Sequence, residues 1–276
     1  MPVAVTEVTC KSALTGSGGS YRLNPYVGCQ HACVYCYATY IARWRGQEGP
    51  WGSWVQAKTN IPEVLQRELR RRRGVHIMLS TVCDIYQPVE QRHELTRRCL
   101  TVLAEAADQD EGLNVGLLTK SDLILRDIDL LRSFPAGRMR IGFSMTTARD
   151  DVGALLEPGA ARPSRRLAAA RALREAGLAV GLLFAPVLPY VTERELPRLL
   201  DLAEEADLYC AGFDPCNYLD RHVGAKLQQA YERLGPKALA RLNEARSDPD
   251  YRQEVEELFS RCTAARQGAS PTGATA

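Results

Sequence analysis

The sequence predicts an α/β fold in which parallel strands alternate with helices, and three observations support this prediction. The 276 residues are enough for one sizeable α/β domain. Stretches of strand length alternate with stretches of helix length as far as residue 214. Residues 75–81 form an almost continuous apolar run, which is typical of a strand buried on both faces. Strands separated by helices in this way are expected to be parallel, with right-handed crossovers.

The expected elements follow in order along the chain. Tyr21-Arg22-Leu23 is a short strand that leads into a cysteine-rich loop, and residues 37–45 are expected to be helical. Pro62 in the first turn and Gly74 at the end delimit a helix over residues 61–73. The remaining strands are expected at 75–81, 113–120, 140–147, 178–188 and 208–214, and the helices at 90–107, 127–134, 165–176 and 193–206. The six strands are fewer than the eight of a closed barrel.

The two ends of the chain depart from this pattern. Residues 1–20 include a polar, glycine-rich stretch, so we expect a flexible N-terminal segment there. The α/β domain is expected over residues 21–220. Expected helices at 226–233, 236–246 and 250–265 predict a C-terminal helical extension over residues 221–266, and the small polar residues 267–276 predict a disordered tail.

Charge and composition narrow the function classes. The chain has 35 basic and 33 acidic residues, a net charge of +2, whereas a protein with a broad phosphate-binding face is usually more basic. Tight generic DNA binding is therefore disfavoured, although a local basic patch stays open. No apolar run of membrane-spanning length occurs, and residues 1–11 lack a signal-peptide pattern. Nine cysteines without framework spacing are typical of a reducing cytoplasm, where we expect the protein.

Three thiols, Cys29, Cys33 and Cys36, fall within eight residues and predict a metal centre. Iron–sulfur clusters are held by thiolates in such short runs. A cubane needs one ligand per iron, so three thiols leave one iron without a nearby protein ligand. An open coordination position is typical of a catalytic metal site. Gly28 would let the backbone approach the metal closely.

These thiols have two other interpretations. A zinc site that adds His31 to the three cysteines has suitable ligand types, but no second Cys-x2-Cys lies downstream. A disulfide fits less well, because three is an odd number and no secretory signal precedes it. The cluster is preferred, zinc is the alternative, and His31 is expected to support the site rather than to bind metal.

The spacing Cys-x3-Cys-x2-Cys, with an aromatic residue before the last cysteine, resembles the signature of the radical S-adenosylmethionine (SAM) superfamily. The wider pattern Asn-Pro-Tyr-x-Gly-Cys-x-His-x-Cys-x-Tyr-Cys-Tyr-Ala resembles the spore photoproduct lyase-like branch, whose named member repairs a thymine-dimer lesion in DNA. The resemblance implies a partial (β/α)6 TIM-type barrel. It also implies that Cys29, Cys33 and Cys36 each bind one iron of a [4Fe-4S] cluster and that SAM chelates the fourth. Reductive cleavage of SAM would then yield a 5′-deoxyadenosyl radical that takes a hydrogen atom from the substrate.

Candidate SAM ligands come from the strand ends, where active residues of parallel barrels lie. Ser80 and Thr81 are expected near the SAM ammonium group, although this sequence lacks the Gly-Gly-Glu pattern usual in the superfamily. Asp84 could accept a hydrogen bond from the ammonium. Lys120 is expected to pair with the SAM carboxylate and Ser144 to hydrogen-bond it.

Other residues near these strand ends have two interpretations each. The resemblance places Tyr35 near the adenine. A thiol in this part of the photoproduct lyase returns a hydrogen atom to the product radical, which makes Cys83 the candidate catalytic residue, although the register of the chain differs. The alternative for Cys83 is a small buried apolar side chain. The hydroxyl groups at the strand ends could instead cap the helices that follow them. The turn Glu157-Pro158-Gly159 could contact SAM or substrate.

Three functions are compatible with these features. The first is a lyase-like radical SAM enzyme that acts on a DNA lesion or a nucleotide-derived molecule. The second is a radical SAM tailoring enzyme of small-molecule (secondary metabolite) biosynthesis, which the near-neutral charge favours. The third, from another class, is a non-catalytic iron–sulfur or zinc redox sensor. The resemblance implies SAM and a reducing partner such as flavodoxin or ferredoxin. DNA or a nucleotide is a further expected partner under the first function, and the lack of a long apolar run predicts no membrane.

Overall fold

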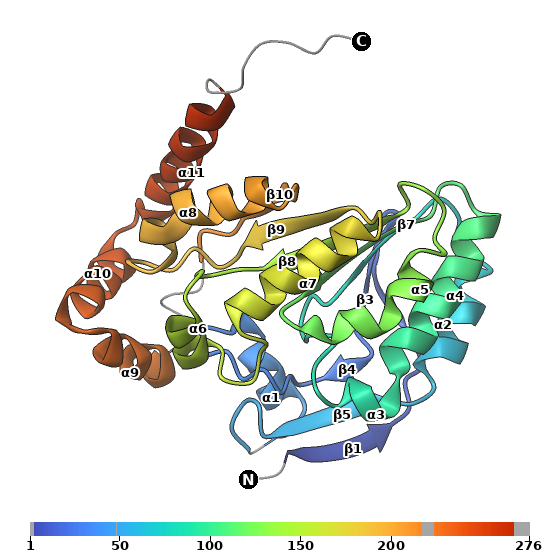
Figure 1. Ribbon diagram of the computed structural model, residues 1–276. Coiled ribbons are helices and arrows are strands. Elements are labelled where there is room, and N and C mark those ends of the chain that lie inside the picture. Colours follow the sequence, from blue (N-terminus) through green and yellow to red (C-terminus); the bar gives the residue numbers. More distant parts are fainter. Residues whose placement is uncertain (1–2, 48, 217–223, 268–276) are drawn as a thin grey trace, which may run out of the picture.

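The chain folds into an open, curved sheet with helices on its outer face, as seen in a computed structural model that describes residues 3–47, 49–216 and 224–267 (Figure 1). The main sheet has seven strands in the order β10-β9-β8-β7-β6-β3-β2. Six of them are parallel, namely β3 (Ser20–Leu23), β6 (His76–Leu79), β7 (Asn114–Thr119), β8 (Met139–Ser144), β9 (Val180–Phe184) and β10 (Tyr209–Phe213). The edge strand β2 (Leu14–Ser17) is antiparallel to β3. Within the described residues the sheet does not close, which confirms the predicted partial barrel.

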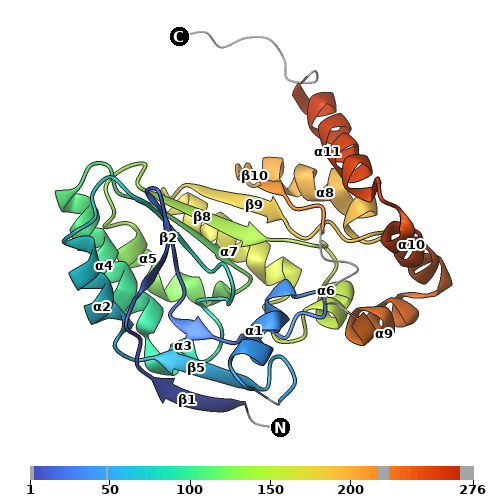
Figure 2. The same cartoon turned by 180° about the vertical axis from the view of Figure 1, so that it is seen from behind.

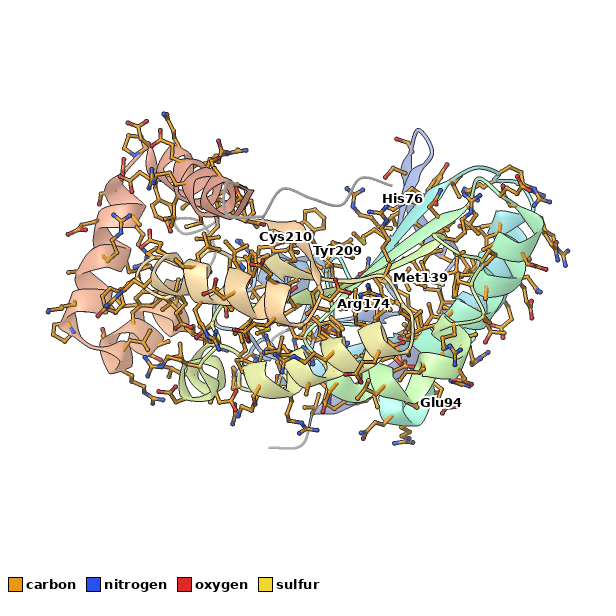
Figure 3. All side chains as sticks on the ribbon, turned by 45° about the horizontal axis from the view of Figure 1, so that its top comes forward. His76, Glu94, Met139, Arg174, Tyr209 and Cys210 are labelled. Atoms are coloured by element: carbon orange, nitrogen blue, oxygen red, sulfur yellow. The ribbon has the colours of Figure 1, made fainter. Side chains whose placement is uncertain are left out.

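Helices connect the parallel strands and cover the outside of the sheet (Figures 1 and 2). A continuous apolar core lies between these helices and the strands. The helices before the C-terminal extension are α1 (Tyr40–Trp44), α2 (Ile61–Leu69), α3 (Glu90–His93), α4 (Leu95–Gln109), α5 (Ile128–Leu131), α6 (Asp150–Leu156), α7 (Pro163–Glu175) and α8 (Thr192–Glu205), with 3-10 turns at Tyr37–Thr39 and Asp122–Asp127. Figure 3 looks onto the side where β6, β8 and β10 begin, at the labelled His76, Met139 and Tyr209. The strand ends that carry the predicted site residues lie on the opposite side.

The helix expected over residues 90–107 is divided into α3 and α4 at Glu94, which has a left-handed conformation with φ 50°. The buried carboxylate of Glu90 explains the break. It accepts hydrogen bonds from the backbone N–H groups of Thr96 (2.9 Å) and Arg97 (3.2 Å). Glu90 therefore caps the first turn of α4, which requires the chain to bend between the two helices.

The N-terminal segment over residues 1–20, which was expected to be flexible, contains the strands β1 (Ala4–Val8) and β2 and the start of β3 in the described residues. The strand β1 pairs in parallel with β5 (Trp54–Lys58), and β4 (Tyr26–Val27) pairs with the other side of β5. β1 is largely exposed and therefore lacks the apolar run from which strands are predicted. The glycine-rich stretch forms the β2–β3 turn, where Gly18 and Gly19 have φ of 62° and 83°.

The C-terminal extension consists of α9 (Gly224–Leu234), α10 (Pro236–Ser247) and α11 (Tyr251–Gln267), which confirms the three expected helices. α11 packs against α8, and Phe259 stacks on Phe213 of β10 with ring centroids 4.2 Å apart. The extension thus lies at the β10 edge of the sheet (Figure 2). The expected boundary at residues 220–221 and the expected tail beyond Gln267 lie outside the described residues. No helix of the described part is long and apolar enough to cross a membrane.

Candidate active site

The ends of the parallel strands and the loop after β4 enclose a cavity of about 520 Å³. All ten residues that the sequence predicts for the site line this cavity, namely Cys29, Cys33, Tyr35, Cys36, Ser80, Thr81, Cys83, Asp84, Lys120 and Ser144. They come from segments up to 115 residues apart in the chain (144 − 29). The fold therefore brings the predicted thiols and the predicted polar groups to one place.

The cysteine loop owes its path to short backbone contacts rather than to regular structure. Cys36 N donates to Cys33 O at 3.1 Å, and Ala32 has a left-handed conformation with φ 52°. At Gly28, where φ is 86°, a Cβ would lie 2.6 Å from Trp54 O. Only glycine allows the loop to approach β5 this closely.

Burial dominates the electrostatics of the three thiols. It raises the pKa of Cys29 well above its ordinary value, and the negative charge of Asp84 adds to the shift. Burial likewise raises the pKa of Cys33 to about 12, against the opposing charge of Lys120, and raises the pKa of Cys36. Coordination by a metal deprotonates such thiols outright, so metal loading would release protons.

The three thiols are suitable donors for an iron–sulfur cluster. Within the described residues, no three His, Cys, Asp or Glu side chains are placed to hold one metal ion. A cubane distributes its thiolates over separate irons. The zinc alternative would need its sulfur ligands to meet about 2.3 Å from one ion.

Asp84 connects the cysteine loop to the ends of two strands. Its carboxylate accepts hydrogen bonds from Thr119 Oγ1 (2.9 Å) and Lys120 N (2.7 Å), and it lies 3.4 Å from His31 Nδ1. Its own backbone N–H donates to Cys29 Sγ at 3.4 Å. The contact with the SAM ammonium stays a prediction, and these bonds give Asp84 a second role in positioning the loop. His31 is buried at this junction, as its expected supporting role requires, and burial lowers its pKa.

The turn after β6 is organised by Asn24, which sequence reasoning did not assign to the site. Asn24 Oδ1 accepts hydrogen bonds from the backbone N–H groups of Thr81 (3.0 Å) and Val82 (3.2 Å), and Asn24 Nδ2 donates to Thr81 Oγ1 at 3.0 Å. Ser80 has φ 72°, and its hydroxyl donates to Cys83 O at 2.8 Å. The side chains of Ser80 and Thr81 are thus already engaged in shaping the turn.

Cys83 is buried at the end of this turn and lines the cavity. Its thiol donates to Asn24 Oδ1 at 3.7 Å. Burial raises the pKa of Cys83 to about 12, although the nearby Lys58 opposes the shift. The side chain is therefore a protonated thiol at neutral pH, which is the form needed to donate a hydrogen atom.

Lys120 and Ser144 present polar groups to the cavity. Lys120 Nζ lies 5.8 Å from the centroid of the Tyr35 ring, which places the predicted adenine-side residue beside it. Burial lowers the pKa of Lys120, but the charges of Cys33 and Glu157 outweigh burial and raise it. We find no hydrogen bond or ion pair for Lys120 Nζ or the Ser144 hydroxyl in the described part of the chain. Because burying a charge without a partner is costly, we expect an anionic group of a ligand to pair with the Lys120 ammonium.

A buried ion pair lies behind the cysteine loop. The carboxylate of Glu157 accepts hydrogen bonds from Tyr35 Oη and from the Arg166 guanidinium, and both charged residues are 1% exposed. Arg166 also donates to Ser144 O (3.0 Å) and Ala161 O (2.8 Å). Burial opposes ionisation of Glu157, but Arg166 and Lys120 outweigh it and lower its pKa. Glu157 therefore acts from behind the loop and does not line the cavity itself.

The segment around Glu157, residues 156–161 together with Arg166, is called the clasp below. Its backbone binds the cysteine loop twice, through Val34 N to Leu156 O (2.9 Å) and Gly159 N to His31 O (3.0 Å). A third bond, Ala161 N to Lys120 O at 3.1 Å, reaches the end of β7. The clasp thus holds the thiol loop and two of the predicted SAM-binding strand ends in one assembly.

The family model described as the radical SAM superfamily matches residues 23–203, which is 181 of the 276 residues and extends from β3 through most of α8. This chain belongs to the radical SAM superfamily. The family implies an iron–sulfur cluster and SAM, and the cysteine loop and the cavity lie within the matched region.

Curated relatives cover most of this radical SAM protein. An uncharacterized protein of Methanocaldococcus jannaschii is 33% identical over 178 residues, which is 64% of each chain. An uncharacterized protein of Mycobacterium tuberculosis is 34% identical over 200 residues, 68% of this chain and 57% of that one. The chain therefore spans less than two thirds of the length of these relatives.

Solved structures of spore photoproduct lyase share the fold of this radical SAM protein. The lyase complexed with dinucleoside spore photoproduct has a TM-score of 0.67 at 17% identity, covering 95% of this chain and 79% of that one. A mutant lyase with bound AdoMet, which is SAM, and dinucleoside spore photoproduct has a TM-score of 0.61 at 16% identity, covering 94% and 76%. At this identity the likeness shows the fold, including the open barrel.

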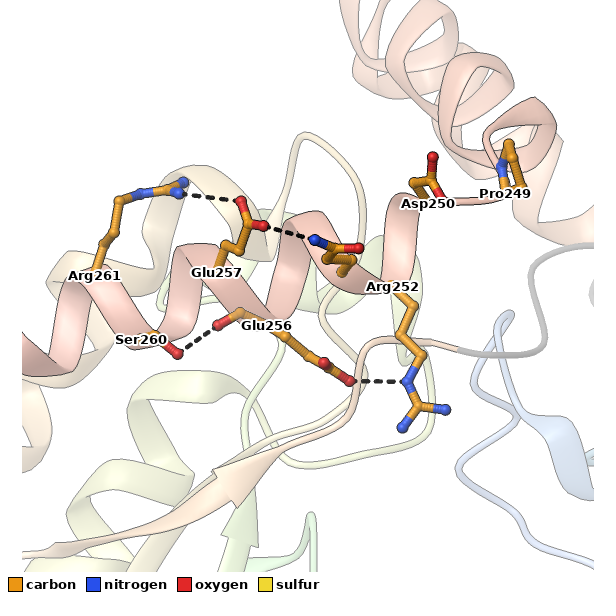
Figure 4. A pocket seen from close by; sticks show the side chains of 8 residues that line it. Pro249, Asp250, Arg252, Glu256, Glu257, Ser260 and Arg261 are labelled. Atoms are coloured by element: carbon orange, nitrogen blue, oxygen red, sulfur yellow. Dashed lines mark hydrogen bonds and ion pairs between the residues drawn. The ribbon is translucent and has the colours of Figure 1, made fainter.

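A second hollow, on the outer side of α11, is larger but has none of these features. Figure 4 shows that its charged side chains pair along the helix, as in Arg252 with Glu256 and Arg261 with Glu257. All its lining residues belong to residues 249–261, and no cysteine is among them. Of these two hollows, the cavity at the strand ends is therefore the candidate site.

Proposed function

We propose that this chain is a radical SAM enzyme in which Cys29, Cys33 and Cys36 each hold one iron of a [4Fe-4S] cluster and SAM takes the fourth. The single observation that carries the proposal is that these thiols line the same cavity as the Lys120 ammonium and the Ser144 hydroxyl. On reduction, the bound cluster and SAM supply a 5′-deoxyadenosyl radical that takes a hydrogen atom from the substrate.

The residues of this chain bind and orient the reactants. Lys120 pairs with the SAM carboxylate, and Ser144 donates a hydrogen bond to it. The turn at Ser80 and Thr81 faces the ammonium, and Tyr35 lies at the adenine. Within the described residues, neither the Lys120 ammonium nor the Ser144 hydroxyl has a hydrogen-bond or ion-pair partner, so both are open to a ligand.

Cys83 is assigned the donation of a hydrogen atom to the product radical. Its burial keeps the thiol protonated, and the side chain lines the cavity. The Asn24 side chain holds the thiol in place through the turn after β6. Asp84 positions the cysteine loop against the ends of β6 and β7.

For the substrate, we propose a DNA lesion or a nucleotide-derived molecule. The support is the shared fold with a lyase whose structures hold dinucleoside spore photoproduct. The second candidate, a small-molecule tailoring enzyme, is favoured by the net charge of +2. We place the enzyme in a reducing cytoplasm, in keeping with nine free cysteines, with flavodoxin or ferredoxin as electron donor.

The test is anaerobic reconstitution with iron and sulfide, followed by reduction with dithionite in the presence of SAM. We expect about four irons per chain and release of 5′-deoxyadenosine and methionine. A redox sensor would bind iron but release no 5′-deoxyadenosine. The matched pair of variants is Cys33→Ala, which should lose iron, and Cys99→Ala, a buried thiol outside the site that should keep it. A Cys33→Ala protein with full iron content would refute the ligand assignment.

A further inference from the structure

The inner face of the open sheet carries cations that the proposed chemistry does not use. The strand registers align Arg22 of β3 with Met78, Met78 with Gly116, and Gly116 with Arg140 of β8. Aligned residues of parallel strands point to the same face, and so do residues two apart on one strand. Lys120 lies four residues after Gly116, and Ser144 lies four residues after Arg140. Both Lys120 and Ser144 line the cavity. Arg22 and Arg140 therefore lie on the cavity face of the sheet.

The charge on this face is one-sided. The positions of β3, β6, β7 and β8 that point to it include Arg22, His76 and Arg140, and no Asp or Glu is among them. Arg22 and His76 line the cavity, and all three are exposed. In the part of the chain that the structure describes, their side chains have no hydrogen-bond or ion-pair partner. A chain with a net charge of only +2 thus places two unpaired arginines, Arg22 and Arg140, on the inner face of the sheet, with the imidazole of His76 between them.

Acidic groups of the same cavity lie elsewhere, near the ends of the strands. Asp84 is occupied by the bonds described above. Asp214 follows β10 and accepts a hydrogen bond from Cys216 N at 2.9 Å. Burial raises the pKa of Tyr209, and the charge of Arg140 opposes this shift, so Arg140 lies toward β10. Figure 3 labels His76 and Tyr209 on the side of the molecule where β6 and β10 begin.

Between the two arginines the inner face of the sheet is apolar. Met78 Sδ lies 3.1 Å from the point that a Cβ on Gly116 would occupy, and Leu118 lies over Gly142 in the same way. Each long side chain is thus laid over the glycine of the next strand. With strands about 4.8 Å apart, Arg22 and Arg140 are separated by about 14 Å across the sheet. An apolar face with cations at its margin suits a planar group that carries phosphates.

We propose that Arg22, His76 and Arg140 form a subsite for phosphate groups of the substrate. This inference rests on the proposed function, because it places the phosphates on the molecule that reacts beside SAM. The phosphate comes either from a phosphodiester of a nucleic-acid strand or from a nucleotide monophosphate. Both share the chemistry that a guanidinium recognises.

The experiment measures binding without turnover, on the reconstituted enzyme with SAM and no reductant. The probe is a fluorescein-labelled DNA tetranucleotide of random sequence, followed by fluorescence anisotropy. We expect Arg22→Gln and Arg140→Gln each to raise the Kd about tenfold at about 50 mM salt and to reduce the slope of log Kd against log salt concentration by about 0.7. Arg22→Lys should stay close to the wild type, which shows that charge rather than folding is responsible. Arg132→Gln, an exposed arginine at the end of α5, is the matched control and should bind unchanged.

Competition identifies the source of the phosphate. Displacement of the probe by the four deoxynucleoside 5′-monophosphates, but not by the four deoxynucleosides, supports a monophosphate subsite. Displacement only by unlabelled tetranucleotide supports a phosphodiester subsite. Equal displacement by deoxynucleosides, lack of probe binding by the wild type, or wild-type affinity in both arginine variants would overturn the proposal. Release of 5′-deoxyadenosine is assayed separately, so failure of the SAM chemistry is distinguished from failure of the subsite.

Discussion

The buried pair of Glu157 and Arg166 offers the sharpest test of how the site is held together. Arg166→Met removes the partner of a carboxylate that is 1% exposed and leaves two carbonyl groups, Ser144 O and Ala161 O, without their donor. Breaking a buried ion pair from one side costs about 3–5 kcal/mol. The two lost carbonyl bonds place Arg166→Met near the upper end of this range.

Glu157→Gln should cost less than Arg166→Met. The amide has nearly the shape of the carboxylate. Its one oxygen can still accept from Arg166, and its NH2 group can donate to the Tyr35 hydroxyl oxygen. The double variant Glu157→Leu/Arg166→Met removes both charges together. Its cost should be well below the sum of the two single variants, because neither charge is left buried alone.

The assay is thermal and urea unfolding of the anaerobic protein, with iron content measured in parallel. A loss of 3–5 kcal/mol corresponds to a fall in Tm of about 6–20 °C for a domain of this size. Because the clasp holds the cysteine loop through Tyr35, Arg166→Met should also retain less iron after gel filtration. A loss below about 1 kcal/mol, or strict additivity in the double variant, would show that the pair does not hold the loop.

Four further changes test the same account. Gly159→Ala would push a methyl group against the Gln30 carbonyl oxygen and should cost about 1–3 kcal/mol in urea unfolding; unchanged stability would mean that the clasp can move aside. Lys120→Met should weaken SAM binding about tenfold in anaerobic equilibrium dialysis while the protein stays folded, and unaltered affinity would rule out the carboxylate contact. Cys83→Ala should leave 5′-deoxyadenosine release intact and change the product, whereas the same product at the same rate would reduce the thiol to packing. The pKa of Glu157 is lowered from 4.5 in the folded protein. The stability advantage of the wild type over Glu157→Gln should therefore be complete above about pH 4.5 and decline as the pH falls through the lower folded-state pKa. An advantage that grew on acidification would contradict this sign.

The strands were predictable because a parallel strand buried on both faces leaves a clear record in the sequence. All six expected strands are present. β6, β7, β9 and β10 fall within the residues predicted for them, and β3 and β8 each begin one residue earlier than predicted. Two features left no such record. The strand β1 is exposed and gains its order only by pairing with β5, some fifty residues away. The break at Glu94 depends on where the Glu90 carboxylate points, which periodicity does not encode.

The membership of the site was predictable in the same way, whereas its internal bonding was not. The rule that active residues follow parallel strands placed Lys120 and Ser144 correctly at the cavity. The bonds that hold the site join residues far apart in sequence, such as Asn24 with Thr81 and Tyr35 with Glu157. Arg166 lies in a helix that also contains Arg165 and Arg171. Its burial in the folded protein is what distinguishes it from these two arginines, and the sequence does not show this.

These bonds explain how a loop with almost no regular structure can present three thiols to one cavity. Between β4 and the turn at Tyr37 the cysteine loop has no helix or strand, so its own backbone cannot hold the thiols in place. Three of the contacts that constrain the loop are Asp84 N on Cys29 Sγ, the Trp54 carbonyl against Gly28, and the clasp on His31, Val34 and Tyr35. Two of these three also contact the end of β7, through the backbone of Lys120. A shift of the loop would therefore move the thiols and the predicted SAM-binding cation together, which preserves their relative geometry while the cluster is assembled.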